Sequence, residues 1–455
     1  MKRILVLGAG QSAGFLIEHL LSTAALEDWF VTVGDRDPEL AARRVGDHPR
    51  GEAVGFDAGD TELTASQVAA SDVVVNLLPQ RFQTVLAWTC LRHDCHMVSV
   101  SYRDREMDEM DEEARRRGVL LLTEVGLDPG IDHMSAMAVL ETVRRRGGVV
   151  ETFESYGAGL PAPEVEANPL RYCLTWNPRN VVMAGESGAQ YLRAGRLKLA
   201  PWHRVFEHTW TREVPGLGPM EAYPNRDSLA YRDVFGLHEA STLVRGTLRY
   251  PGWCELWRAV VSLGLPNETL VIPDLAERGL RELVEMFLPD DETGRPLEAR
   301  VAERLGLDED GDVVRRLAWL GLFSDEPCGA HARTPAEALV HLLETRLALP
   351  PEARDMVLLL HLVEARYPDE GDRRERILST LLDFGEPGGW TAMTRTVGLP
   401  AALATSLLLR GELPLTGTQI PTHPAVYRPV LAGLAAAGLR LSETVEEITT
   451  TEVTT

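Results

Sequence analysis

The chain has 455 residues, of which 44% are hydrophobic and 25% charged, as expected for a globular protein of two or three domains. Its formal net charge of −22 argues against a nucleic-acid partner, because the phosphate backbone binds basic surfaces. Apolar runs stay shorter than the roughly 18 residues of a membrane span, so we expect no membrane association. An apolar strand begins at Lys2 or Arg3, which leaves no room for a signal peptide.

The five cysteines lack any Cys-x-x-Cys pair, so the sequence predicts neither a zinc site nor a redox dithiol. Such a sparse, odd set is typical of free thiols in a reducing compartment. We therefore expect a cytoplasmic protein without a bound metal.

The N-terminal segment Ile4–Gly14 joins an apolar strand to a helix-forming stretch through Gly8-Ala-Gly10-Gln-Ser-Ala13. This turn lets the backbone approach a pyrophosphate and directs helix N–H groups at it. Asp35 ends the next strand, about 20 residues beyond the motif, where an acid accepts from a ribose 2′-hydroxyl. The glycine turn alone is weak evidence, but with both flanks and Asp35 it predicts a dinucleotide site.

The first 125 residues alternate strands and helices. The expected strands are Arg3–Leu7, Phe30–Asp35, Ala53–Asp57, Val73–Asn76, Met97–Ser101 and Val119–Thr123, with helices such as Phe82–His93 and Arg105–Arg117 between them. The strands are continuous apolar runs, as in a parallel sheet covered on both faces. This rhythm predicts an α/β fold, a Rossmann-like doubly wound parallel sheet.

Turn-forming and polar residues follow the carboxyl ends of these strands, the edge at which such sheets bind ligands. Each is an ordinary loop alone, but together they suggest a cleft. The candidate cofactor-binding residues are Gly8, Gly10, Gln11, Ser12, Ala13, Asp35, Arg36, Asp57, Asn76, Leu77, Leu78, Ser101, Leu127, Asp128 and Pro129.

Beyond Gly130 the pattern changes. We expect a helix over Asp132–Arg146 with Asp132 as its N-cap, short strands over about 150–265, a helical subdomain over 267–350, strands Met356–Ala365 and Arg374–Phe384 around an acidic turn at Asp369–Asp372, a helix over Trp390–Arg410, and a disordered tail Ser442–Thr455.

Five long segments carry a family resemblance. They are Glu124–His133, Gly159–Glu164, Tyr223–Ser228, Val244–Tyr250 and Ala318–Asp325. Together they resemble saccharopine reductase, the L-glutamate-forming saccharopine dehydrogenase of the aminoadipate lysine pathway. The similarity runs in the same order from about residue 3 to residue 440.

The resemblance implies three parts and an activity. A Rossmann-like domain covers 1–130 with a return segment at about 388–441, a mixed-sheet α+β substrate-binding and dimerisation domain covers 131–266 and 351–387, and a small helical domain covers 267–350. The implied protein is a homodimer that oxidises saccharopine with NAD or NADP. The imine that forms is hydrolysed to glutamate and aminoadipate semialdehyde, and the reaction is reversible.

The resemblance also assigns substrate contacts. Arg226 and Arg245 fall on positions where arginines of the family contact the substrate, whose carboxylates match guanidinium forks. Arg249 is a third candidate, although the usual fate of an arginine is a surface ion pair. Ser101 is also placed at the substrate.

Tyr102 and Asp128 are the candidate catalytic residues, since imine formation and water addition move protons. The alternative without a catalytic role is a half-buried core tyrosine for Tyr102 and an ordinary Asp-Pro-Gly turn for Asp128. His133 is a further candidate, or only a residue of a first helical turn.

Two residues depart from the family pattern. Gly157 stands where the family's Ser-Tyr-Cys-Gly-Gly segment has cysteine, so no thiol acts there. Asp35 favours NAD over NADP, because a carboxylate repels a 2′-phosphate, whereas Arg36 beside it can reach one.

Two other functions remain open at this point. One is a related dehydrogenase acting on another carboxylated secondary amine, such as carboxynorspermidine. The other is a non-catalytic nucleotide-binding scaffold on the same fold, because fold does not fix function.

Overall fold

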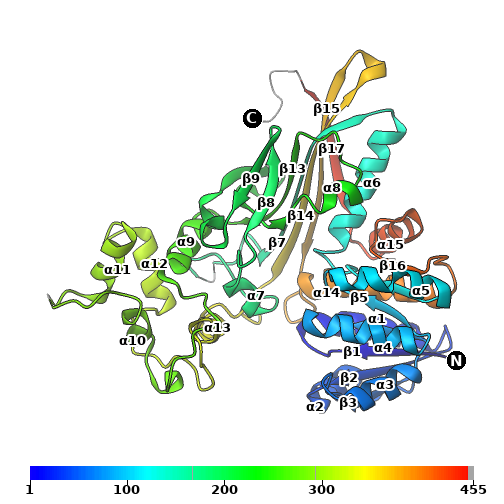
Figure 1. Ribbon diagram of the computed structural model, residues 1–455, viewed down its shortest axis with the longest axis horizontal. Coiled ribbons are helices and arrows are strands. Elements are labelled where there is room, and N and C mark those ends of the chain that lie inside the picture. The colour runs from blue at the N-terminus through cyan, green and yellow to red at the C-terminus, as the bar shows by residue number, and fades with distance from the viewer. Residues whose placement is uncertain (167, 293, 449–455) are drawn as a thin grey trace. The chain divides into compact units, whose positions relative to one another are not determined.

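The computed structural model describes residues 1–166, 168–292 and 294–448 (Figure 1). These residues form two compact units. The first consists of Met1–Gly148 and Leu381–Glu443, and the second of Val149–Thr380 and the residues from Thr444 on.

The first unit is built on a parallel sheet, which has seven strands among the described residues, in the order β16-β6-β5-β4-β1-β2-β3. The strands are β1 Lys2–Leu7, β2 Trp29–Asp35, β3 Gly51–Gly55, β4 Val73–Asn76, β5 His96–Ser99, β6 Leu120–Leu122 and β16 Gly417–Gln419. The predicted Rossmann-like sheet is confirmed. Two details differ from the prediction. Strand β3 ends before Asp57, and β16, from the C-terminal part of the chain that returns to this unit, pairs with β6.

The first unit also contains helices. They are α1 Gly14–Ala24, α2 Pro38–Val45, α3 Thr61–Ala69, α4 Gln83–Arg92, α5 Asp111–Arg117, α6 Ile131–Arg145, α14 Ala392–Leu409 and α15 Pro424–Ala436, with 3-10 turns at Gln11–Ala13, Gln80–Phe82 and Arg105–Met110. The predicted helices over Phe82–His93, Arg105–Arg117 and Trp390–Arg410 are found within a few residues of their expected ends.

Helix α14 is the one helix in the described part of the chain that is long and apolar enough to span a membrane, and 67% of it is buried inside the protein. A core helix meets the same criterion. Gly398 of α14 allows close packing on α1, because a Cβ there would lie 3.0 Å from the Leu16 nitrogen. The apolar side chains of α14 therefore pack inside the first unit.

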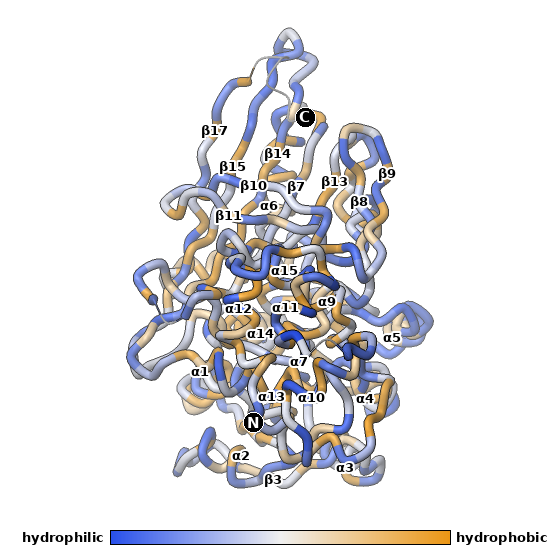
Figure 2. Tube along the Cα trace, turned by 90° about the vertical axis from the view of Figure 1, so that its left-hand side faces the viewer, coloured by the Kyte–Doolittle hydropathy of each residue, from blue (hydrophilic) through white to orange (hydrophobic). Residues whose placement is uncertain are grey.

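The second unit contains a mixed sheet, which has ten strands among the described residues; its main path is β10-β11-β13-β7-β14-β15-β17, and β8, β9 and β12 branch from it. The strands are β7 Val149–Pro161, β8 Ala189–Arg193, β9 Arg196–Ala200, β10 Trp210–Val214, β11 Gly218–Pro224, β12 Arg226–Asp227, β13 Thr242–Arg249, β14 Asp355–Tyr367, β15 Arg373–Phe384 and β17 Leu441–Ile448. The predicted β14–β15 hairpin is present, and its polar tip is blue in Figure 2.

Helices follow or interrupt the strands of the second unit. They are α7 Pro178–Val182, α8 Tyr231–Val234, α9 Trp253–Leu263, α10 Leu280–Glu285, α11 Leu297–Leu305, α12 Asp312–Leu320 and α13 Pro335–Arg346, with 3-10 turns at Trp202–Glu207, Leu275–Glu277 and Pro368–Glu370. Residues 267–350 contain helices and no named strand in their described part, as the sequence predicted.

Two local predictions were wrong. Ser442 and the residues up to Ile448 were expected to be disordered, but they form most of strand β17, which pairs with β15. The rest of the predicted tail, 449–455, lies outside the described residues. Asp132 was expected as an N-cap, but α6 begins one residue earlier with Gly130 as its cap, and the Asp132 carboxylate accepts from the Gly130 N–H at 2.6 Å.

Candidate functional site

The glycine turn follows β1 as the sequence predicted. Gly8 has a φ of +99°, and a Cβ there would lie 3.1 Å from the Leu77 carbonyl oxygen, so only glycine fits without strain. A Cβ at Gly10 would meet nothing within 4 Å. Gln11, Ser12 and Ala13 form the 3-10 turn that leads into α1. This turn has the form of a pyrophosphate-binding loop, with open space beside Gly10.

Asp35 lies beside this turn. One carboxylate oxygen accepts from the Ala9 N–H at 2.7 Å and the other from the Asp37 N–H at 2.9 Å. A carboxylate has about four lone-pair directions, so these two bonds orient Asp35 and leave acceptor capacity. Arg36 follows directly and its side chain is exposed. Asp35 and Arg36 thus present opposite charges at the end of β2.

Three residues that sequence reasoning missed hold the back of the turn. The Arg44 Nε donates to the Ala9 carbonyl at 3.2 Å, and Thr394 of α14 donates to the Gln11 carbonyl at 3.1 Å. The Trp390 ring occupies the space that a Cβ on Gly14 would need. Burial and the neighbouring Arg43 lower the pKa of Arg44 from its ordinary value. Gly14, the residue after the motif, therefore allows close packing against the returning chain.

The candidate cofactor-binding residues at the ends of β3 and β4 differ in their exposure. Asp57 is exposed and its carboxylate accepts from the Gly59 N–H at 2.8 Å, which forms a turn after the strand. Asn76 is buried, donates to the Ser99 hydroxyl at 3.1 Å and accepts from the Leu78 N–H at 3.1 Å. The amide of Asn76 thus fixes the Leu77–Leu78 backbone.

A chain of hydrogen bonds continues from Ser99 to Tyr102. The Ser99 hydroxyl donates to Gln83 at 2.6 Å and accepts from the Ser101 N–H at 3.3 Å. Gln83, on α4, then donates to the Tyr102 carbonyl at 2.6 Å. These bonds fix the backbone that carries Ser101 and Tyr102. Gln83 carried no motif signal in the sequence.

The two predicted catalytic side chains lie together. The Tyr102 hydroxyl donates to Asp128 Oδ1 at 3.1 Å. Asp128 precedes Pro129 through a cis peptide bond, and Leu127 beside it is 7% exposed. A phenol bound to a carboxylate provides one proton donor and one acceptor at a single place, which suits chemistry at an amine.

The side chain of His133, on α6, is not exposed to solvent. It is fully buried, and its Nε2 lies 2.6 Å from a carboxylate oxygen of Glu124. The two end residues of the segment Glu124–His133 are therefore in contact, and Asp128 lies on the loop between them.

Arg226 and Arg245 belong to the second unit and are held close to each other. The Asn225 N–H donates to the Arg245 carbonyl at 2.9 Å, and the Arg245 N–H donates to the Ser228 hydroxyl at 2.8 Å. Arg226 is exposed with a φ of +56°, whereas Arg245 is 7% exposed. The Arg245 guanidinium lies 4.3 Å from the centre of the Tyr231 ring.

Arg249 has a different environment from these two. It is 3% exposed, and its guanidinium is surrounded by the rings of Tyr172, Tyr223 and Trp253 at 5.1, 5.9 and 5.7 Å. Its Nη1 donates to the Leu248 carbonyl at 2.8 Å. In this conformation Arg249 is part of the core, so the structure does not place it with Arg226 and Arg245.

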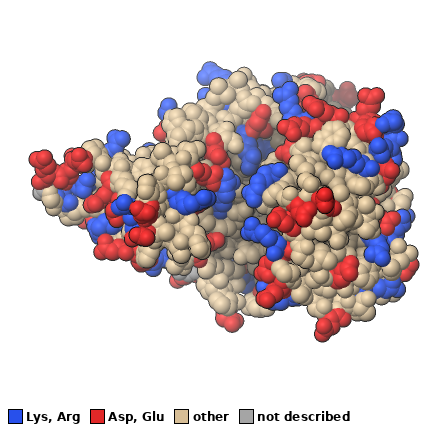
Figure 3. Space-filling model, turned by 60° about the horizontal axis from the view of Figure 1, so that its bottom comes forward, with Lys and Arg blue, Asp and Glu red and all other residues tan. Residues whose placement is uncertain are grey.

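On the molecular face in Figure 3, basic side chains stand among acidic ones, which is the usual environment of surface arginine.

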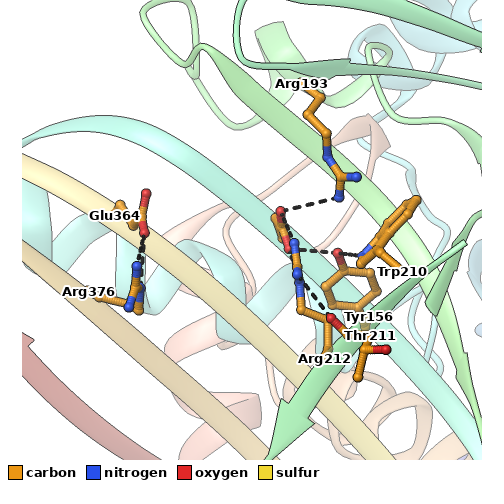
Figure 4. A network of polar contacts seen from close by, with 8 residues as sticks. Tyr156, Arg193, Trp210, Thr211, Arg212, Glu364 and Arg376 are labelled. Carbon is orange, nitrogen blue, oxygen red and sulfur yellow. Dashed lines mark hydrogen bonds and ion pairs between the residues drawn. The ribbon is translucent and has the colours of Figure 1, made fainter. Parts of the chain in front are cut away.

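A buried polar network lies in the strands next to Arg245 (Figure 4). Glu154 of β7 is fully buried and accepts two hydrogen bonds from Arg212, at 2.7 and 2.8 Å, and one from the Tyr156 hydroxyl at 2.6 Å. Trp210 donates to the same hydroxyl at 2.8 Å. Burial and the Glu154 charge raise the pKa of Tyr156 well above its ordinary value. The network fixes β7 against the β10 edge of the sheet.

Gly157 follows in the same strand. Its backbone pairs with Thr247 of β13 and with Leu359 of β14. The position where the resembled family has a cysteine is thus the middle of a three-strand pairing, without a side chain.

Two family models cover most of the chain. Residues 4–122 match the saccharopine dehydrogenase NADP binding domain, and residues 126–439 match the saccharopine dehydrogenase C-terminal domain.

Curated relatives match along the whole chain. The saccharopine dehydrogenase [NADP(+), L-glutamate-forming] of Schizosaccharomyces pombe is 31% identical over 454 residues, which is 97% of this chain and 99% of that protein. The Saccharomyces cerevisiae protein of the same name is 33% identical, over 95% of this chain and 96% of that protein. The mitochondrial alpha-aminoadipic semialdehyde synthase of Bos taurus is 33% identical, over 96% of this chain, and this chain spans 47% of that synthase.

A solved structure has the same fold. The apo saccharopine dehydrogenase (L-Glu forming) from Saccharomyces cerevisiae superposes with a TM-score of 0.86 at 29% identity, over 98% of this chain and 100% of that one.

Proposed function

Because this chain belongs to the saccharopine dehydrogenase family, we propose that it interconverts saccharopine with L-glutamate and L-2-aminoadipate 6-semialdehyde, using NAD or NADP. The observation that carries the proposal is the Tyr102–Asp128 pair at the rim of a dinucleotide-binding sheet, in a chain that spans nearly all of the L-glutamate-forming relatives. The activity belongs to lysine metabolism.

The first unit would hold the cofactor. The turn from Gly8 to Ala13 suits the pyrophosphate, and Asp35 with Arg36 lies where the adenosine ribose is expected. A bound nicotinamide cofactor supplies hydride transfer to or from carbon. The protein contributes an ordered loop whose Ala9 and Gln11 carbonyls are already held by Arg44 and Thr394.

The substrate carries three carboxylates around one secondary amine. Arg226 and Arg245 are suited to the carboxylates, because guanidinium forks bind them with two parallel hydrogen bonds. Tyr102 and Asp128 are suited to the amine, with the phenol exchanging a proton and the carboxylate stabilising the iminium that oxidation produces. Ser101, beside Tyr102, is a further substrate contact in this proposal. Gly157 supplies no thiol, so no step uses one.

The cofactor preference is a finer proposal. Asp35 supports NAD, because its carboxylate repels a 2′-phosphate and still has lone pairs for a free 2′-hydroxyl. The fungal relatives are named for NADP(+). Asp35 is thus the residue on which a difference from those relatives depends.

The test is turnover by the purified full chain. Saccharopine with NAD or NADP should produce reduced nicotinamide absorbance, and glutamate with the semialdehyde and reduced cofactor should consume it. Turnover of a carboxynorspermidine-type amine but not of saccharopine would establish the related dehydrogenase instead. Cofactor binding by calorimetry without turnover of either amine would indicate the scaffold.

The homodimer and the cytoplasmic location stay predictions, as do the expected absences of a membrane and of a nucleic-acid partner. Light scattering on the eluted protein tests the dimer, with a mass near twice 50.2 kDa expected.

A further inference from the structure

Glu124 has an unusual backbone in the loop after β6. Its φ of +61° lies in the left-handed region, which is strained for a residue other than glycine. Its N–H donates to the Ser101 carbonyl at 3.0 Å, and the Val125 N–H donates to the Ser99 carbonyl at 3.0 Å. The backbone at Glu124 is therefore bound to the loop that carries Tyr102.

The Glu124 carboxylate extends this connection. One oxygen accepts from the Arg103 N–H at 2.9 Å, next to Tyr102 in the chain. The other lies 2.6 Å from His133 Nε2. His133 Nδ1 lies 3.1 Å from an oxygen of Asp132, and the second Asp132 oxygen accepts from the Gly130 N–H at 2.6 Å. One continuous polar chain thus joins the Tyr102 loop to the Asp128 loop.

All three side chains of this chain are buried, at 5% exposed for Glu124, 0% for His133 and 2% for Asp132. The two ring nitrogens of His133 each lie close to a carboxylate oxygen, Nε2 to that of Glu124 and Nδ1 to that of Asp132. Burying ionised groups is costly even when they are paired, so stability alone is a poor reason for such a triad.

We propose that Glu124, acting through His133 and Asp132, is a positioning residue that fixes Tyr102 and Asp128 against each other. This inference rests on the proposed function, because it concerns the two residues assigned to the amine. Neither Glu124 nor His133 is placed in contact with substrate. Their effect on turnover comes through the geometry of the Tyr102–Asp128 hydrogen bond.

Glu124→Gln is the sharpest variant. The amide oxygen still accepts from Arg103, whereas the negative charge opposite His133 is lost. Asp132→Asn changes the other end of the chain while keeping an acceptor for Gly130, and serves if Glu124→Gln does not fold. Glu141→Gln on α6 is the matched control, because Glu141 accepts from the Tyr427 hydroxyl at 2.7 Å, away from these loops.

Saccharopine oxidation by Glu124→Gln should show kcat reduced at least tenfold, with KM for the cofactor within twofold of wild type and kcat of Glu141→Gln unchanged. A folded Glu124→Gln or Asp132→Asn protein with kcat within twofold of wild type overturns the positioning role. So does an equal loss in Glu141→Gln.

The two proposals fail separately. Wild-type protein that does not oxidise saccharopine overturns the proposed function. Whatever the activity, a crystal structure of Glu124→Gln decides the positioning role: a displaced Asp128 and a broken Tyr102–Asp128 bond support it, and a hydrogen bond retained near 3.1 Å overturns it.

Discussion

The hydroxyl of Tyr102 donates to a carboxylate oxygen of Asp128 at 3.1 Å, although the two residues follow different strands of the sheet. Tyr102 lies on the loop after β5 and Asp128 on the loop after β6. Because β5 and β6 are parallel neighbours, their carboxyl ends meet at one edge, and the loops bring the two side chains within hydrogen-bond distance.

Removing either member of this pair should slow turnover. Tyr102→Phe and Asp128→Asn should each lower kcat for saccharopine by roughly 100-fold, within the usual range for loss of a positioned acid or base. Because the two side chains share a hydrogen bond, the double variant should lose less than the product of the single losses. Steady-state kinetics test this, and two multiplicative losses would show independent roles.

Replacing Asp35 with alanine should change cofactor choice. Loss of the carboxylate removes the repulsion of a 2′-phosphate, so the ratio of kcat/KM for NADP to that for NAD should rise roughly tenfold, about 1.4 kcal/mol. Both cofactors should also bind more weakly, because the Ala9 N–H loses its acceptor. An unchanged ratio would show that Asp35 does not lie at the ribose.

Arg226→Ala should affect the substrate selectively. KM for saccharopine should rise at least tenfold while KM for the cofactor stays within twofold, because a lost bidentate carboxylate contact weakens substrate binding alone. Arg232→Ala is the matched control, since this exposed arginine of α8 donates to the His238 carbonyl. Equal increases in both KM values would remove Arg226 from the substrate site.

The buried Glu154 should matter for stability. Glu154→Gln leaves the Arg212 guanidinium without its carboxylate and should lower the free energy of unfolding by about 3 kcal/mol. Glu207→Gln, in the exposed ion pair with Arg204, should cost about 0.5 kcal/mol or less. Urea denaturation measures both, and equal effects would mean that burial adds nothing to the Glu154 contact.

The five cysteines should be unreactive in the folded protein, since all are buried. Burial raises the pKa of Cys173 and that of Cys328 to about 11, so both remain protonated at pH 8. A chromogenic disulfide reagent should therefore titrate less than one thiol before unfolding and all five in guanidinium. Rapid reaction of a native thiol would contradict this burial.

The same raised pKa values predict a dependence of stability on pH. The folded protein holds these protons more tightly than the unfolded chain, in which a thiol has its ordinary pKa of 9.0. Their contribution to stability is complete below pH 9.0 and is lost as pH rises towards about 11. Unfolding midpoints measured across this range should fall, and Cys173→Ser should reduce the slope.

Local sequence determined the first unit most fully. Apolar runs of four to seven residues with a glycine turn after the first are sufficient to specify parallel strands, because such strands are buried on both faces. The same reasoning placed Tyr102 and Asp128 at one rim. The family motifs, rather than periodicity, brought Arg226 and Arg245 into the prediction.

Tertiary structure decided what the local pattern does not carry. Strand β16 has only three residues, and it forms because β6 offers a row of unpaired backbone groups and Asp111 accepts from Thr418 at 2.9 Å. The local sequence of the acidic segment Ser442–Ile448 predicts disorder. In the structure the segment pairs with β15, where Arg376 donates to Glu446 at 3.0 Å. Backbone pairing and long-range charge contacts outweigh a weak local preference.

The contacts behind the site also depend on the folded chain. Arg44 and Gln83 showed no motif, because hydrogen bonds to the Ala9 and Tyr102 carbonyls have no sequence signature. Sequence alone determined which strands and glycines make a dinucleotide site, since those follow from periodicity and backbone freedom. Only the tertiary structure decided that Arg249 is enclosed by aromatic rings and that Glu124 and His133 meet across nine residues, because burial and side-chain pairing arise when distant segments pack.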